Sequence, residues 1–152
     1  MVGEVEKFHE FVIGEKFDAL MVMAAQQWTF DALWPILDKL PNTRKVLIPC
    51  GFSGLYDPLF KKYFEHMPAI LNKFDHLVFH SKKYGDIDFE RQNEIEHFSV
   101  LPCGASHAVF DVETDQTFRS RHNINEDDFL FLTVGSFTGL KGHKELLKAF
   151  EI

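Results

Sequence analysis

The chain has 152 residues, 45% of them hydrophobic, which is enough for a buried core and argues against a disordered protein. Its 16 basic and 23 acidic residues give a net charge of -7, which disfavours nucleic acid as a partner because a polyanion is repelled. No stretch approaches the ~18 consecutive apolar residues of a membrane span, and the first residues lack the basic start of a secretion signal. We therefore expect a cytoplasmic protein.

The first predicted element is a helix near the N-terminus. Its apolar face and the glycine that ends it are Val5, Phe8, Val12 and Gly14. Apolar residues recur at the same spacing in residues 30–37 and in residues 59–71, which predicts two more helices. Pro58 suits the first turn of the second of these. Pro35 and Pro68 lie inside the patterns, so we expect them to kink or restart their helices.

Short apolar runs alternate with these helical segments. The runs are residues 19–23, 46–48, 77–79, 98–101 and 129–134. Runs of this length between amphipathic helices are typical of parallel strands that crossover helices bury on both faces. The sequence therefore predicts an α/β fold with a Rossmann-like parallel sheet flanked by helices.

A mostly polar tract, DVETDQTFRSRHNINEDD, separates the last two runs. Its isolated apolar anchors include Phe118 and Ile124, a composition that predicts a linker with one charged helix. We therefore expect three parts. Residues 1–110 are the later part of one domain, residues 111–128 are the linker, and residues 129–152 open a second domain with a strand, a loop and a helix.

The loop after the last run is a candidate phosphate-binding site. Gly135, Gly139 and Gly142 surround Lys141. Glycines let the backbone approach an anion, while the amides of the following helix and the lysine charge attract it. The spacing matches neither the dinucleotide fingerprint nor the Walker pattern, so a tight turn with a solvated lysine is the alternative.

Three segments resemble the retaining glycosyltransferases of family 4, which have the GT-B fold. FLFLTVGSFTGLKGHKELLKAF is similar to the strand, G-R-L-x-x-x-K-G loop and helix that open the donor domain of that family. HLVFHSKKYGDIDF is similar to its strand that ends in serine before a helix, and FSVLPCGASHAVF to its I-P-N-G-V-D-x-x-x-F segment. The resemblance covers roughly Asp18 to the end of the chain and implies a partial GT-B fold.

The resemblance implies a fragment of an enzyme that moves a sugar, with retention, from a nucleotide-sugar donor to an acceptor hydroxyl. It implies no metal and no other cofactor. Gly135, Ser136 and Lys141 would bind the donor diphosphate, although the family usually has arginine at Ser136. The family's first glycine-rich loop would precede residue 1 and its E-x7-E motif would follow Ile152. We therefore expect these 152 residues alone to be inactive.

Residues that contact the acceptor are expected where the strands end. Cys50 and Gly51 follow the second run, and the family often has a histidine facing the sugar in place of Cys50. Tyr56, Asp57 and His107 lie in loops after strands, where the active sites of open parallel sheets form. These five residues are the candidates for the acceptor side.

Two further features have simpler interpretations. Cys50 and Cys103 each follow an apolar run without C-x-x-C spacing, which favours two reduced thiols over a redox pair or a metal site. His76 and His80 lie on one face of a strand, about 13 Å apart at ~3.3 Å per residue, too far to share a zinc ion. The sequence predicts no metal site.

Partners follow from exposed features of the predicted elements. Lys61, Lys62 and Tyr63 suggest peripheral membrane contact in the full-length enzyme, but two lysines contribute only ~1 kcal/mol each, which favours a solvated helix face. The strand at residues 129–134 lacks the rest of its sheet, so we expect a homodimer or a domain swap. The alternative to an enzyme is a non-enzymatic Rossmann-like ligand-binding or interaction domain, in which this strand completes the first sheet.

Overall fold

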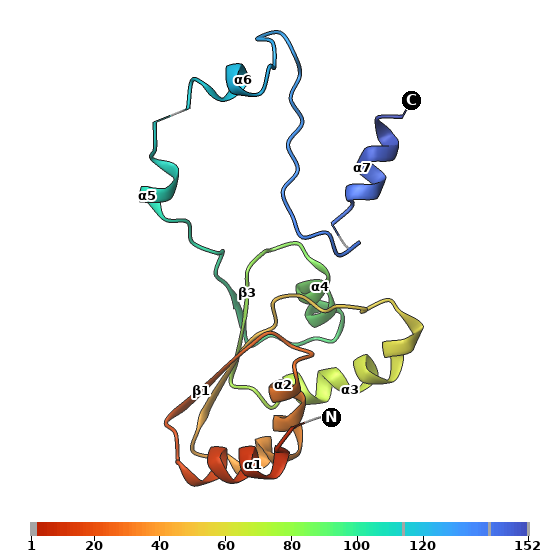
Figure 1. Cartoon of the computed structure of the whole chain (residues 1–152). Helices are drawn as coiled ribbons and strands as arrows, with labels where there is room; N and C mark the ends of the chain where they lie inside the picture. Colours follow the sequence, from red (N-terminus) through yellow and green to blue (C-terminus); the bar gives the residue numbers. More distant parts are fainter. Residues whose placement is uncertain (1–2, 114, 140, 152) are drawn as a thin grey trace. The chain divides into compact units, whose positions relative to one another are not determined.

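The chain forms two compact units, Met1–Ala105 and Ser106–Ile152. The computed structural model describes residues 3–113, 115–139 and 141–151. The first unit contains a four-stranded parallel sheet in which spatial order follows chain order (Figure 1). Its strands are β1 Ala19–Met23, β2 Arg44–Ile48, β3 His76–Phe79 and β4 Phe98–Val100. The predicted α/β fold with a parallel sheet is confirmed.

Helices connect the strands of the first unit and precede β1. They are α1 Val5–Gly14, α2 Trp28–Leu33, α3 Lys61–Leu71 and α4 Gly85–Gln92, with the 3-10 helices η1 Trp34–Lys39 and η2 Pro58–Phe60. Pro35 lies in the first turn of η1, directly after α2, which confirms the predicted restart. Pro58 opens η2 as predicted. Pro68 lies inside α3, which continues to Leu71 without a restart.

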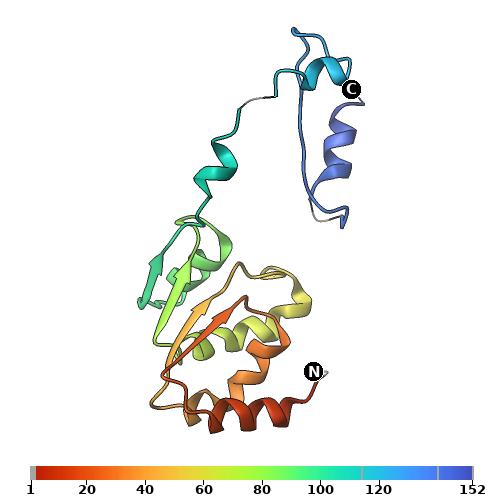
Figure 2. The same ribbon diagram turned by 60° about the vertical axis from the view of Figure 1, so that its left-hand side comes forward.

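The helices of the first unit lie along one face of the sheet (Figure 2), and the hydrophobic core lies between them and this face. Along each of β1, β2 and β3, buried residues of this face alternate with exposed or half-buried residues of the other face. The buried strand residues pack with residues from all four α-helices. The buried strand residues are Val22, Leu47, Leu77 and Phe79. On the other face Met21 and Met23 are 68% and 61% exposed, and Ile48 and Val78 are half-buried.

This one-sided core corrects the prediction that helices bury the strands on both faces. Among the described residues of the strands, none whose side chain lies on the second face is buried. The physical reason is the strand order. Each strand is added on the same side of the previous one. Because crossovers between parallel strands are right-handed, connections in this order all pass over the same face of the sheet.

The second unit contains three short helices, α5 His107–Phe110, α6 Phe118–Arg121 and α7 His143–Ala149. The predicted strand at residues 129–134 is wrong, because this segment is irregular and exposed. A strand requires a partner for its backbone groups, and the amides of residues 129–134 donate to no backbone carbonyl among the described residues. The helices predicted in the linker and after the glycine loop are present as α6 and α7.

Candidate functional site

The carboxyl ends of β2 and β3 border a pocket of about 290 Å³. Its lining residues are Cys50, Gly51, His80, Ser81, Tyr84 and Asp86. A neighbouring pocket of about 390 Å³ includes Tyr56 and Asp57, and Tyr84 lines both pockets. Open parallel sheets bind ligands at this edge. The structure therefore brings four of the five predicted acceptor-side residues, Cys50, Gly51, Tyr56 and Asp57, to one edge of the sheet.

The turn after β2 requires its glycine. Cys50 and Gly51 both have left-handed backbone conformations, with φ of 58° and 95°. A side chain at Gly51 would place its Cβ 3.1 Å from the Tyr84 ring, so the absence of a Cβ lets this ring close one wall of the pocket. The Gly51 amide also donates a hydrogen bond of 2.9 Å to Asp86, which ties the turn to α4.

Helix α4 carries two buried carboxyl groups one turn apart. Asp86 accepts hydrogen bonds from the amides of Gly51 and Ile87 at 2.9 and 2.8 Å. Glu90 is fully buried, and neither of its carboxyl oxygens has a hydrogen-bond partner among the described residues. Burial, and secondarily the negative charge of Asp86, raise the pKa of Glu90 to about 8. Glu90 is therefore mostly protonated at pH 7.

Sequence reasoning missed this pair, although a signal was present. Asp86 and Glu90 are four residues apart and so share a helix face with buried Ile87. In a sequence, an acidic residue on the apolar face of a predicted helix indicates a buried carboxyl group of this kind.

His80 follows β3 and faces the turn after β2. Its Nε2 lies 4.0 Å from the Cys50 Sγ, and its Nδ1 lies 3.0 Å from the carbonyl oxygen of Leu101. His76, at the start of the same strand, instead lies 3.0 Å from the Ser99 hydroxyl. Cys50 was predicted from the sequence to lie at a strand end, but its contact with His80 was not predicted.

The predicted phosphate loop belongs to the second unit. Gly139 and Gly142 adopt left-handed conformations with φ of 77° and 70°. The side chains of Lys141 and His143 lie against Gly135, where an added Cβ would be 3.3 Å from Lys141 Cγ and 3.2 Å from His143 Cε1. Ser136 is the neighbouring loop residue, and its carbonyl accepts a hydrogen bond from Thr138. The loop thus folds its lysine back onto its first glycine.

His107, the fifth predicted acceptor-side residue, also belongs to the second unit. It is the first residue of α5, and its Nδ1 lies 3.6 Å from an Asp111 carboxyl oxygen. Both side chains are largely exposed. The structure therefore assigns His107 to a different unit from the pocket at the carboxyl edge.

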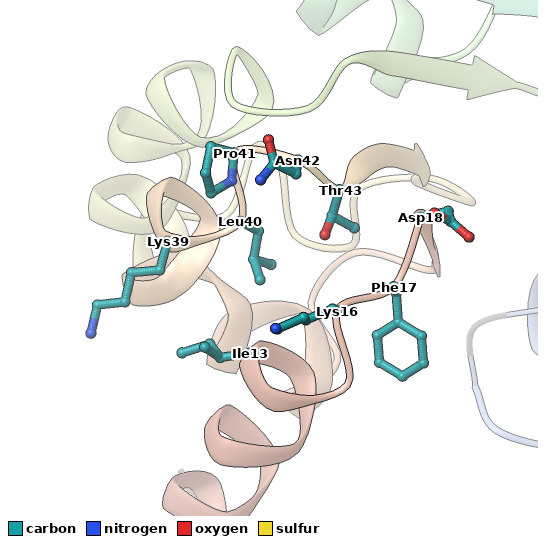
Figure 3. Close-up of a pocket in the computed structure, with 9 residues that line it drawn as sticks. All are labelled: Ile13, Lys16, Phe17, Asp18, Lys39, Leu40, Pro41, Asn42 and Thr43. Carbon is teal, nitrogen blue, oxygen red and sulfur yellow. The ribbon is translucent and has the colours of Figure 1, made fainter.

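A third hollow, of about 240 Å³, lies at the opposite edge of the sheet, where β1 and β2 begin (Figure 3). Ile13 lies in the last turn of α1, and Lys16 follows this helix by two residues. Lys39 is the last residue of η1. Figure 3 shows Asp18 pointing away from both lysines. Because open parallel sheets bind ligands at their carboxyl edge, this hollow is not the favoured site.

Tyr63 is a packing residue of α3. Its hydroxyl donates a 2.7 Å hydrogen bond to Asp31, and its ring lies 5.0 Å from that of Trp34 between centroids. Burial raises the pKa of Tyr63, and the hydrogen bond with Asp31 adds to this effect. Lys61 and Lys62 are exposed. Of the three residues considered for membrane contact, only the two lysines face solvent.

Among residues 3–113, 115–139 and 141–151, no three His, Cys, Asp or Glu side chains are grouped as metal ligands. None of the helices described there has the length and apolar character needed to cross a membrane. Comparisons of the chain with protein-family models, with curated proteins and with solved structures found no match.

Proposed function

We propose that this chain is part of a glycosyltransferase that moves a sugar from a nucleotide-sugar donor to an acceptor hydroxyl with retention. The observation that carries the proposal is the pair of adjoining pockets at the carboxyl edge of the parallel sheet. These pockets gather four of the five residues expected on the acceptor side, Cys50, Gly51, Tyr56 and Asp57, and this edge is where such sheets bind ligands.

The second of these pockets offers groups suited to a sugar. Asp57 Oδ1 accepts a hydrogen bond from the Leu59 amide, which fixes the carboxylate while its second oxygen is available to accept from a hydroxyl. Tyr56 and Tyr84 are exposed, so they present aromatic rings and phenolic hydroxyls to a ligand. A few oriented polar groups beside aromatic surface are typical of small-molecule sites.

The glycine loop of the second unit supports the donor side of the proposal. An added Cβ at Gly139 or Gly142 would meet nothing within 4 Å, so a diphosphate can approach the backbone there, and Lys141 lies between these two glycines in the chain. The lysine ammonium group would stabilise the negative charge that develops on the departing nucleoside diphosphate. Ser136 adds a hydroxyl as a hydrogen-bond donor.

The test uses the intact protein encoded by the gene that contains these residues. We expect nucleoside diphosphate release from one or more nucleotide sugars, accelerated by acceptor, with NMR of the product showing that the anomeric configuration of the donor is retained. The chain of 152 residues alone is expected to release none. Absence of release by the intact protein across uridine, guanosine and adenosine diphosphate sugars would contradict the proposal.

We also propose that the 152-residue chain self-associates through residues 129–134. Several side chains of this segment are largely exposed, Phe129 at 94%, and its amides lack backbone partners among the described residues. An antiparallel pair of these segments about a two-fold axis would satisfy the backbone groups. Centred on Leu132, which would lie opposite its own symmetry mate, the pair would place Asp128 of one copy opposite Ser136 of the other, next to Gly135 and the Lys141 side chain that lies against it. The charges at both ends are then complementary.

Substitution of Leu132 by lysine tests this pairing. We expect light scattering to show a dimer for the unchanged chain and a monomer for Leu132→Lys, because a charged side chain would be buried between the two copies. Leu147→Lys is the matched control, since Leu147 is 68% exposed on α7 outside the segment. A monomeric unchanged chain in which the amides of residues 129–134 exchange rapidly would contradict the proposal.

A further inference from the structure

Cys50 and His80 are held together by the sheet itself. They follow the neighbouring parallel strands β2 and β3, so their separation depends on the strand pairing and not on a flexible loop alone. The left-handed conformation of Cys50 turns the chain sharply after Pro49. The result is a distance of 4.0 Å between the thiol sulfur and the imidazole Nε2.

The carbonyl of Leu101 determines which imidazole nitrogen carries the proton. A carbonyl oxygen only accepts hydrogen bonds, so the His80 Nδ1 at 3.0 Å must donate. In the neutral ring Nε2 is then the unprotonated nitrogen, and it faces the thiol. Cys50, His80 and Leu101 therefore follow three successive strands of the sheet. They supply a nucleophile, a base and a group that orients the base, the combination that activates nucleophiles in enzymes.

The surroundings leave the thiol accessible. Cys50 is exposed and lines the pocket of about 290 Å³, which is open to a small molecule. Of the other groups lining this pocket, Ser81 and Tyr84 are polar and Asp86 is the acidic one. The negative charge of the Asp86 carboxylate disfavours a thiolate at Cys50. Both oxygens of this carboxylate accept hydrogen bonds from backbone amides, those of Gly51 and Ile87, and these bonds offset part of the charge of Asp86.

We propose that Cys50 is a nucleophilic thiol activated by His80 and a site of covalent modification by small soft electrophiles. Sulfur attacks the electrophilic carbon as the thiol proton passes to His80 Nε2. With iodoacetamide an S–C bond forms, the C–I bond breaks, iodide leaves, and His80 then releases the proton to solvent. The inference is independent of sugar transfer, because it rests on the thiol and the imidazole alone.

The chain contains its own control thiol. Cys103 is exposed like Cys50, but no imidazole lies within hydrogen-bond distance of it among the described residues. With limiting iodoacetamide at pH 7 and peptide mapping by mass spectrometry, we expect Cys50 to be alkylated at least about tenfold faster than Cys103. In concentrated urea the two rates are expected to converge, because unfolding separates Cys50 from His80.

Two histidine variants assign the effect to the base. His80→Gln is expected to lower the Cys50 rate to that of Cys103, whereas His76→Gln, on the same strand but bonded to Ser99, should leave it unchanged. Equal rates for the two thiols in the folded protein would overturn the proposal, as would a Cys50 rate unaffected by His80→Gln. If His80→Gln does not fold, the comparison of Cys50 with Cys103 in the unchanged chain decides.

Discussion

Under the proposed function, replacement of Lys141 by alanine is expected to slow nucleoside diphosphate release by the intact protein about 100-fold or more. Oriented groups that stabilise charge in a transition state typically have effects of this size. The lysine is suited to this role because it lies in the chain between Gly139 and Gly142, where the backbone is open to an anion. The measurement is the rate of nucleoside diphosphate release at saturating donor and acceptor.

The matched control for this experiment is Lys148→Ala. Lys148 carries the same charge but lies in the last turn of α7, away from the glycine loop. We expect its replacement to change the rate by less than about twofold, because an exposed charge interacts weakly across solvent. Equal effects of the two substitutions would show that only the overall charge matters and would contradict the role assigned to Lys141.

Replacement of Glu90 by glutamine is expected to remove most of the pH dependence of stability between pH 5 and pH 9. The folded pKa of Glu90 is about 8, against an ordinary value of 4.5. The folded state therefore binds this proton more tightly than the unfolded state. Its contribution to the free energy of unfolding is complete below about pH 4.5 and is lost as the pH rises through 8.

The unchanged chain should lose on the order of a few kcal/mol across this range, as measured by urea unfolding. The glutamine in Glu90→Gln cannot ionise, so the stability of this variant should stay nearly constant and exceed that of the unchanged chain at pH 9. The range starts at pH 5 because the Lys45 amide holds the pKa of Asp75 low, so Asp75 keeps its charge there. Exposed Glu94→Gln is the control. Parallel pH profiles for Glu90→Gln and the unchanged chain would contradict the prediction.

The sequence was sufficient to predict the strands of the first unit, because they are short apolar runs between helical patterns. The run at residues 19–23 coincides with β1. The one-sided burial was not predictable in the same way, since Met21 and Met23 are apolar although their side chains are exposed. Likewise, residues 129–134 have the composition of a buried strand, but strand formation depends on a distant partner that local composition does not specify.

The candidate site was predictable where it depended on strand ends. Cys50 and Gly51 were found because the carboxyl ends of parallel strands form one edge of the sheet. The contacts between Cys50 and His80, and between Gly51 and Asp86, join residues 30 and 35 positions apart. Such distances arise from tertiary packing, so no pattern of neighbouring residues specifies them.

The strand order of the first unit also bears on how the protein is made. Each strand of the sheet pairs with the one synthesised just before it, so no strand has to wait for a partner encoded much later. Folding is fast when contacting residues are close along the chain, and domains fold as units during translation. The nascent chain can therefore complete this sheet while the residues after Ala105 are still being added.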